Sequence, residues 1–414
     1  MNTQRITFLV VVVGGILLFA IFSMWFIFLR APAPAPTSTN GPVFGTGSNV
    51  STVGTGADTD NINNVQPITG QVSTQRIFLV ATGPVAGATL VQTLHPTTTI
   101  VRYALANNGH IFDLPLDSPG SVPRAVSNTT IPGVVHTLWT EAGRGVVFQY
   151  LDGDVFKSVH VALPAASATS STPAPIRIQF LPDNIASIAA SPDGTQVAYL
   201  LVTAAGADGY TAKADGTGSK KLFSLPLIEL VLSWPSPNTL LVQTKSAAGV
   251  PGMLFSIGVK SGAVVPLLYA AGLTAVADTA FSNVVYQKTS ESGDAHTTYV
   301  HNVGSGTDIA LSFDPFPEKC IWSVANANML YCAAPLQFTA WNYLDLWHQG
   351  LGNVAESILS FNVSTGASNI AALPGSKDGG VGGAIENFAL SIDDRYLLFV
   401  AQGNQTLWGV RLMQ

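Results

Sequence analysis

Charged side chains are scarce in this chain of 414 residues, because only 10% of them are Asp, Glu, Lys or Arg. A typical soluble domain has about 25%. The 18 Lys and Arg are outnumbered by 24 Asp and Glu, which gives a formal net charge of −6. A protein that binds a nucleic-acid backbone needs a basic excess, so we expect no nucleic acid among the partners. Cysteine is also rare, with two residues and no CxxC redox motif.

One long uncharged run stands near the N-terminus, from Ile6 to Leu29. A helix of this length, at about 1.5 Å per residue, exceeds the ~30 Å hydrocarbon core of a bilayer. We therefore expect residues 1–30 to hold a cytoplasmic N-terminus and a transmembrane helix, with residues 6–29 in contact with lipid. The basic residues at the two ends differ little, and their distribution favours export of the rest of the chain. The alternative is a signal peptide cleaved near Ala31–Ala33, which would release the remainder.

Residues 31–74 open with APAPAPTSTNGP and continue in Gly, Ser, Thr and Asn. Such a composition buries too little apolar surface to offset the entropy of ordering. We therefore expect a disordered tether, with a root-mean-square span of about 35–40 Å.

Residues 75–414 contain a repeat in which a turn is followed by an apolar strand. Two columns of mostly aromatic residues recur in register seven times. The first column is Tyr103, Phe148, Tyr199, Val242, Tyr286, Cys332 and Phe399. The second is Phe112, Phe156, Tyr210, Phe255, Tyr299, Leu359 and Trp408. Most steps are close to the period of about 40–50 residues that is typical of four-stranded propeller blades.

The fold expected from this repeat is an all-β, seven-bladed propeller over residues 75–414. The last copy lacks a fourth strand, while a spare strand, Arg76–Val80, precedes the first copy. We expect this N-terminal strand to complete the last blade and to close the ring. An irregular β-sandwich is the alternative.

The turn-and-strand segment Ser191–Tyr199, SPDGTQVAY, resembles the repeat core of TolB-type, WD40-like (PD40-repeat) propellers, which also occurs in prolyl-oligopeptidase-type peptidases. The whole chain resembles uncharacterised bacterial proteins that place such a propeller behind one transmembrane helix. The resemblance implies a binding platform rather than a particular chemistry. The related peptidases append a hydrolase domain with a Gly-x-Ser-x-Gly nucleophile motif, which this chain lacks, so we expect no serine-hydrolase activity.

Other chemistry-bearing residues are few. His296 and His301 lie close together in an expected hairpin, but no cysteine or carboxylate cluster joins them at a metal-ligand spacing. Residues 152–154 (Asp-Gly-Asp) and 393–394 (Asp-Asp) fill turn positions, where carboxylates bond to the local backbone. Calcium binding at the first pair and acid–base chemistry at the second are the alternatives. We expect no metal, no cofactor and no catalytic residue.

Cys320 and Cys332 lie at equal distances from Asn326, the expected turn of a hairpin. A symmetric antiparallel hairpin places them opposite each other, within reach of a disulfide. We expect them to be bonded in an exported domain, and to be buried thiols in a cytosolic one.

The sixth repeat carries a single long insertion, from Pro335 to Ser357, which is rich in aromatic residues. Insertions in repeat proteins map to one face, which is often the binding face. The candidate binding residues are Phe338, Trp341, Tyr343, Trp347 and His348. The alternative is that these side chains form a private core over one blade.

The expected function is that of a non-enzymatic protein- or peptide-binding or scaffold module of the cell envelope, anchored in the membrane with its propeller outside the cytoplasm. One alternative is binding of an envelope or extracellular glycan by the insertion at residues 335–357. Another is a propeller enzyme, either a lyase or a quinone-dependent dehydrogenase. An enzyme would bring three or more His, Arg or carboxylate side chains from different blades to one channel mouth.

Overall fold

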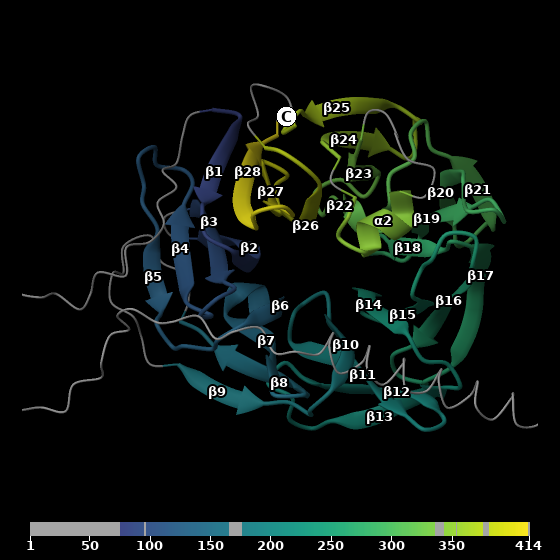
Figure 1. Cartoon of the computed structure of the whole chain (residues 1–414), viewed down its shortest axis with the longest axis horizontal. Helices are drawn as coiled ribbons and strands as arrows, with labels where there is room; N and C mark the ends of the chain where they lie inside the picture. Colours follow the sequence, from purple (N-terminus) through teal and green to yellow (C-terminus); the bar gives the residue numbers. More distant parts are fainter. Residues whose placement is uncertain are drawn as a thin grey trace, which may run out of the picture. The chain divides into compact units, whose positions relative to one another are not determined.

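The structure, a computed structural model, describes residues 75–94, 97–164, 176–335, 343–352, 354–375 and 381–412. In these residues seven four-stranded antiparallel sheets form the blades of a propeller (Figure 1). The first strand of each blade is the innermost one, and the fourth lies at the outer rim. The expected all-β, seven-bladed propeller is therefore confirmed.

Blades 1 to 3 follow one another along the chain. Their strands are β2 (Val85–Leu94), β3 (Thr97–Leu105), β4 (Ile111–Pro115), β5 (Arg124–Ser127), β6 (Val134–Thr140), β7 (Gly145–Asp152), β8 (Val155–Ala162), β9 (Arg177–Phe180), β10 (Ile185–Ala190), β11 (Gln196–Thr203), β12 (Gly206–Lys213) and β13 (Lys220–Leu225). A 3-10 turn, η1 (Glu141–Gly143), joins β6 to β7.

Blades 4 to 7 complete the ring. Their strands are β14 (Leu230–Ser236), β15 (Thr239–Thr244), β16 (Pro251–Gly258), β17 (Val264–Ala271), β18 (Thr274–Ala277), β19 (Asn283–Thr289), β20 (His296–Asn302), β21 (Thr307–Ala310), β22 (Cys320–Trp322), β23 (Met329–Ala334), β24 (Ser357–Asn362), β25 (Ser368–Ala372), β26 (Ile385–Leu390), β27 (Tyr396–Ala401) and β28 (Thr406–Arg411). A 3-10 turn, η2 (Pro317–Lys319), precedes β22, and the short helix α2 (Tyr343–His348) lies between β23 and β24.

The two sequence columns are cross-strand neighbours in the second and third strands of the blades. Tyr199 pairs with Tyr210, for example, and the two rings stack with centroids 5.4 Å apart. Six of the seven column pairs have this register. In blade 2 the partner of Phe148 is Val159, and Phe156 lies three residues earlier on the exposed part of β8. The second column was therefore misaligned in that blade, because an aromatic residue near the hairpin turn has the same pattern as a packed one.

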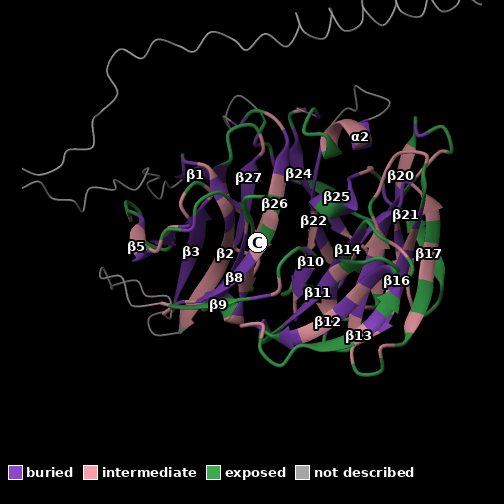
Figure 2. Ribbon diagram, turned by 60° about the horizontal axis from the view of Figure 1, so that its bottom comes forward, coloured by how far each residue is buried: buried purple, intermediate pink, exposed green. Residues whose placement is uncertain are grey.

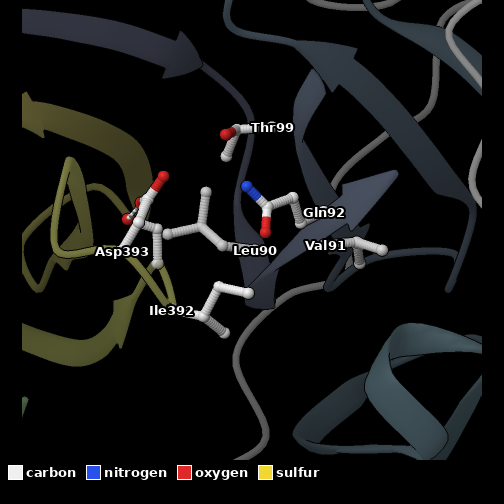
Figure 3. Close-up of a pocket in the computed structure, with 7 residues that line it drawn as sticks. Leu90, Val91, Gln92, Thr99, Ile392 and Asp393 are labelled. Carbon is white, nitrogen blue, oxygen red and sulfur yellow. Dashed lines mark hydrogen bonds between the residues drawn. The ribbon is translucent and has the colours of Figure 1, made fainter. Parts of the chain in front are cut away.

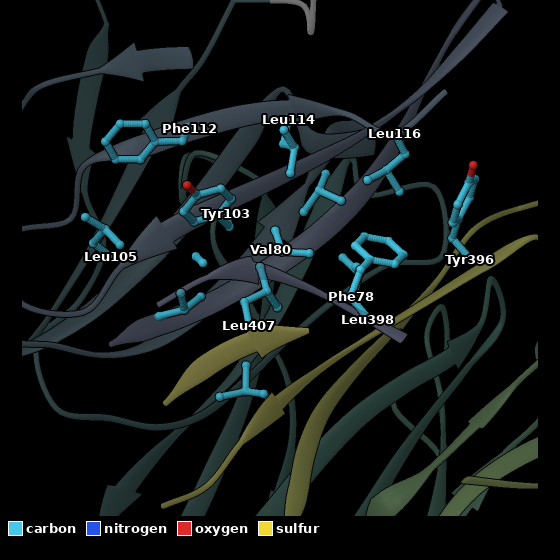
Figure 4. Packing of buried hydrophobic residues seen from close by; sticks show 14 residues of the cluster. Phe78, Val80, Tyr103, Leu105, Phe112, Leu114, Leu116, Tyr396, Leu398 and Leu407 are labelled. Carbon is cyan, nitrogen blue, oxygen red and sulfur yellow. The ribbon is translucent and has the colours of Figure 1, made fainter. Parts of the chain in front are cut away.

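The ring closes between the two ends of the described chain. Strand β1 (Ile77–Ala81) pairs antiparallel with β28 and so completes blade 7, as expected from the sequence (Figure 1). Phe78 and Val80 are buried in a cluster with Tyr103 and Leu114 of blade 1 and Leu398 of blade 7 (Figure 4). One apolar cluster therefore joins the first blade, the last blade and the closing strand.

The faces between neighbouring blades are buried, while the outer strands are largely open to solvent. All four residues of β9 and all four of β21 are exposed, and β13 and β17 show large exposed stretches in Figure 2. The core is thus divided into clusters between blades, as expected when each sheet packs on the next.

The described residues include no helix that is both long and apolar enough to cross a bilayer. The expected transmembrane helix at residues 6–29 and the expected tether at residues 31–74 lie outside the described residues. Both stay predictions.

Candidate functional site

Helix α2 lies on the side of the ring where the second strand of each blade connects to the third, and where each blade connects to the next. We call this side the α2 face. The connection between β15 and β16, the beginnings of β14 and β18, and the turn η2 lie on the same side. Helix α2 therefore lies beside residues of blades 4 and 5.

A buried ionic network fixes the base of α2. The side chains of Lys319 and Glu356 are 1% and 0% exposed, and Nζ lies 2.6 Å from Oε1. Tyr343 donates its hydroxyl to the same carboxylate at 3.2 Å, and the backbone N–H of Ile385 donates to Oε2 at 2.7 Å. Burial, aided by the carboxylate, raises the pKa of Tyr343, whereas burial lowers that of Lys319. The helix is thus held by groups that have left solvent completely.

Aromatic packing also holds the same helix. The ring of Phe316, which is buried, stacks on Tyr343 with centroids 5.3 Å apart and lies 5.9 Å from Trp347. The ammonium group of Lys319 lies 4.7 Å from the centre of the Trp347 ring. Asp345 accepts a hydrogen bond of 2.9 Å from the backbone of Ala248 in blade 4. The short helix is therefore clamped to two blades.

A cleft of about 430 Å³ opens beside α2. We call it the α2 cleft, and it is lined by Val231, Gln243, Thr244, Lys245, Ser246, Thr274, Glu318 and His348. Within it, Nε2 of His348 lies 2.8 Å from Oε1 of Glu318. Burial lowers the pKa of His348, but the hydrogen bond and charge of Glu318 outweigh burial and leave this pKa raised. The cleft therefore holds an ion pair in its wall.

Two residues that line the α2 cleft, Ser246 and Thr274, have buried hydroxyls with no hydrogen-bond partner within the described part of the chain. Both amide atoms of Gln287 and the indole N–H of Trp347 are also buried without a partner there, but these two residues do not line the cleft. Thr274 is 1% exposed and Gln287 is 0% exposed, and the two are direct neighbours on β18 and β19. An unpaired buried polar group costs about 1–3 kcal/mol, so a concentration of them calls for an explanation.

The aromatic residues expected to form a binding surface have divided roles. Tyr343 is buried at the base of α2, Trp347 is half-buried against Phe316, and His348 lines the α2 cleft. Phe338 and Trp341 lie outside the described residues. Ser246, Thr274 and Glu318 also line the cleft and were not predictable from the sequence, because isolated polar residues carry no motif.

A second cavity, of about 660 Å³, lies between blades 2 and 3. Five ionisable residues are among those that line it: Glu141, His160, Arg177, Lys213 and Asp215. His160 is 4% exposed, and burial lowers its pKa despite the nearby charges of Glu141 and Asp215. Glu141 and the following Ala142 both have positive φ, of 49° and 52°, an uncommon backbone conformation for residues other than glycine.

Other candidate sites are structural turns. Asp393 accepts hydrogen bonds from the Ser391 hydroxyl at 2.7 Å and from the Arg395 backbone at 3.2 Å, as expected for a turn carboxylate. The small cavity between this turn and β2 (Figure 3) measures about 10 Å³, the lower limit for one water molecule. His296 lies near the backbone oxygen of Asp314, and His301 near the carboxylate of Asp308. The described residues contain no group of three or more His, Cys, Asp or Glu that could hold a metal.

Cys320 and Cys332 form a disulfide between directly paired residues of β22 and β23. The expectation drawn from their symmetric spacing is confirmed. The bond joins the start of β22, directly after η2, to β23, the strand that precedes the insertion. Turn η2 supplies Glu318 to the α2 cleft.

Comparison with known proteins supports the fold alone and identifies no family or activity. No protein-family model and no curated protein matches the sequence. An oligogalacturonate lyase in complex with manganese covers 84% of this chain and 93% of its own, with a TM-score of 0.55 and 10% identity. The lyase of Vibrio parahaemolyticus covers 85% and 95%, with a TM-score of 0.52 and 8% identity. TolB from Acinetobacter baumannii covers 81% and 66%, with a TM-score of 0.40 and 11% identity.

Proposed function

We propose that this protein is a non-enzymatic binding propeller that holds its ligand in the α2 cleft. The observation that carries the proposal is the cleft itself, which opens beside helix α2. This helix is held in place by the buried groups of Lys319, Glu356 and Tyr343. Pockets of about 300–1,000 Å³ with a few convergent polar groups are typical of ligand sites. The ionisable residues that line this cleft are already paired, Glu318 with His348 and Lys245 with Glu229.

The proposed location is the cell envelope, with the chain anchored through residues 6–29 and the propeller outside the cytoplasm. The disulfide between Cys320 and Cys332 supports an oxidising compartment, because such bonds rarely persist in the cytosol. The proposed ligand is a component of the envelope or of the extracellular medium. A protein or peptide is the first expectation from the sequence.

The test is a cross-linking pull-down from native envelopes with the full chain as bait. Ser246→Arg fills the cleft, and Ser118→Arg places the same group on the exposed connection between β4 and β5. A component retained by wild type and by Ser118→Arg, but lost with Ser246→Arg, supports the proposal. A component retained equally by all three baits contradicts it, because binding would then take place elsewhere.

A second candidate function is catalysis in the cavity between blades 2 and 3. It is favoured by the five ionisable residues there, and above all by a buried histidine close to two carboxylates. Oligogalacturonate is a natural first substrate to try, since lyases that act on it have a similar fold. Products are measured by mass spectrometry. If wild type converts oligogalacturonate and His160→Ala does not, catalysis replaces binding as the function.

A further inference from the structure

The cavity between blades 2 and 3 lies on the side of the ring opposite to the α2 face, where the first strand of each blade connects to the second. The connection between β6 and β7 supplies Glu141, strand β8 supplies His160, and strand β9 supplies Arg177. Lys213 at the end of β12 and Asp215 just after it complete the charged part of the lining. The volume of about 660 Å³ is in the range typical of ligand pockets. The cavity is therefore a site separate from the α2 cleft.

Charged groups of both signs line this cavity without ion-pair partners. Within the described part of the chain, none of Glu141, Asp215, Arg177 and Lys213 takes part in an ion pair. Asp215 accepts hydrogen bonds of 2.9 and 2.7 Å from the backbone and the hydroxyl of Thr217, both on Oδ1. These bonds lower the pKa of Asp215, so its carboxylate is ionised at neutral pH. The charged residues that line the α2 cleft, by contrast, are paired.

The buried imidazole of His160 leaves the two carboxylates of the cavity without a counter-charge. His160 is 4% exposed and feels the charges of both Glu141 and Asp215, which places it near both groups. Burial outweighs these two charges and lowers the pKa of His160, so its ring is uncharged at neutral pH. The two carboxylates can therefore attract a cation from solvent.

The turn that carries Glu141 is held in place by both neighbouring blades. Glu141 and Ala142 have φ of 49° and 52°, and such strained conformations persist where the surroundings fix them, often at ligand sites. The Glu141 N–H donates a 3.0 Å hydrogen bond to the oxygen of Gly194 in blade 3, where an added Cβ would come within 2.3 Å of the Glu141 nitrogen. In blade 1 the buried Arg102 donates a 2.6 Å bond to the oxygen of Gly143. The backbone that presents the Glu141 side chain is therefore fixed before a ligand arrives.

We propose that this cavity binds a small zwitterion with one ammonium and one carboxylate group, as free amino acids and dipeptides have. The ammonium group lies between Glu141 and Asp215, beside the uncharged ring of His160. The carboxylate binds the guanidinium of Arg177, whose planar N–H groups match a carboxylate, and Lys213 adds a second positive charge. A ligand with a single charge would balance only one sign. This site is additional to the α2 cleft and does not depend on the proposed function.

The test variants remove one charge at each end of the ligand and keep the side chain polar. Glu141→Gln removes the negative charge, and Arg177→Gln removes the positive charge. The matched controls are Glu291→Gln, between β19 and β20, and Lys220→Gln, at the start of β13, both exposed and neither in the cavity lining. All four variants should keep the melting temperature of wild type, because none of these side chains forms an ion pair within the described residues.

The experiment is isothermal calorimetry of the full chain at pH 7, where an α-amino group with a pKa of about 8 is mostly charged. The zwitterionic probes are L-alanyl-L-alanine and L-leucine, which distinguish a dipeptide from a free amino acid. N-acetyl-L-alanyl-L-alanine lacks the ammonium group, and L-alanyl-L-alaninamide lacks the carboxylate. We expect at least one zwitterion to bind, and both blocked dipeptides to bind at least tenfold more weakly. Glu141→Gln and Arg177→Gln should each weaken zwitterion binding at least tenfold, while the two controls should match wild type.

Several results would overturn the inference. They are no binding of either zwitterion, equal binding of a blocked dipeptide, and unchanged affinity in Glu141→Gln or in Arg177→Gln. Trigalacturonate is a further probe, and its binding in place of the zwitterions would overturn the inference in favour of the catalytic candidate. None of these results bears on the α2 cleft, which the pull-down with Ser246→Arg tests on its own.

Discussion

At the scale of single residues, two buried ion pairs stand out in a chain with so few charges. Arg102 binds Asp113 through two hydrogen bonds of 2.7 Å, and it donates further bonds to the backbone oxygens of Gly143 and Pro164. This pair ties β3 and β4 of blade 1 to the connections of blade 2. Lys319 and Glu356 connect turn η2 to the segment before β24, and Glu356 also binds Tyr343 of α2 and the backbone of Ile385 in blade 7. In both cases the charged groups connect segments that lie tens of residues apart along the chain.

The pair under α2 predicts an asymmetric mutational effect. Glu356→Gln leaves the Lys319 ammonium buried without its main counter-ion, so we expect a loss of about 3–5 kcal/mol in the free energy of unfolding. Lys319→Met combined with Glu356→Gln should cost clearly less than the sum of the two single changes. Urea-unfolding midpoints measure both effects.

An exposed ion pair provides the control for this cycle. Lys245 and Glu229 have side chains that are 61% and 66% exposed, so Lys245→Met should cost less than about 1 kcal/mol. Additive effects of Lys319→Met and Glu356→Gln would show that the two groups do not depend on each other.

The pair of His348 and Glu318 predicts a pH dependence. The pKa of His348 is raised above its ordinary value of about 6.5, so its contribution to stability is fully present below that pH. The contribution is lost as the pH rises through the raised pKa. The melting temperature of wild type should exceed that of His348→Gln most at pH 5.5, and the difference should shrink by pH 9.

Histidine NMR titration checks the same prediction directly. Burial lowers the pKa of His110, so its signal should titrate below about 6.5 while that of His348 titrates above it. A His348 signal that titrates at or below the ordinary value would mean that Glu318 does not hold the imidazole.

At the scale of elements, the sequence predicts blades well because their pattern is repeated. Column residues such as Tyr103 and Phe399 are almost fully buried, and the cross-strand register follows from their period. The misaligned Phe156 shows the limit, since the lengths of these hairpins vary among the blades and an aromatic residue near the turn can be mistaken for the packed one. The α2 cleft was not predictable in the same way, because Ser246, Thr274 and His348 come from three different blades and line one cleft only in the assembled ring.

The hairpin of β22 and β23 gives a prediction for its disulfide. The bond closes a short loop with a sequence separation of 12, so replacing both cysteines by alanine should cost about 3 kcal/mol in the chain-entropy model. Chemical unfolding of wild type with and without reductant should show a similar shift, while the double variant should not respond to reductant. Two free thiols in the native, unreduced protein would contradict this.

At the scale of the whole propeller, closure depends on a strand that is far from its partner in sequence. Strand β1 completes blade 7 through its pairing with β28, and its inward side chains reach the core shared with blade 1. The sequence predicts this arrangement from the number of strands, because the last repeat lacks a fourth strand and one strand precedes the first repeat. The packing of side chains where β1 meets β28, by contrast, can be known only from the assembled ring.

That fit gives the last prediction. Phe78 is 1% exposed, and its ring lies over Gly409, where an added Cβ would come within 2.4 Å of Cζ. Phe78→Ala should cost about 3–5 kcal/mol, and Gly409→Ala should destabilise the ring by forcing the aromatic ring away. Combining the two should cost less than their sum, because the smaller side chain leaves room for the new methyl group. Urea unfolding measures the coupling, with Ser118→Ala on the exposed connection between β4 and β5 as the control, and strictly additive effects would show that closure does not depend on this contact.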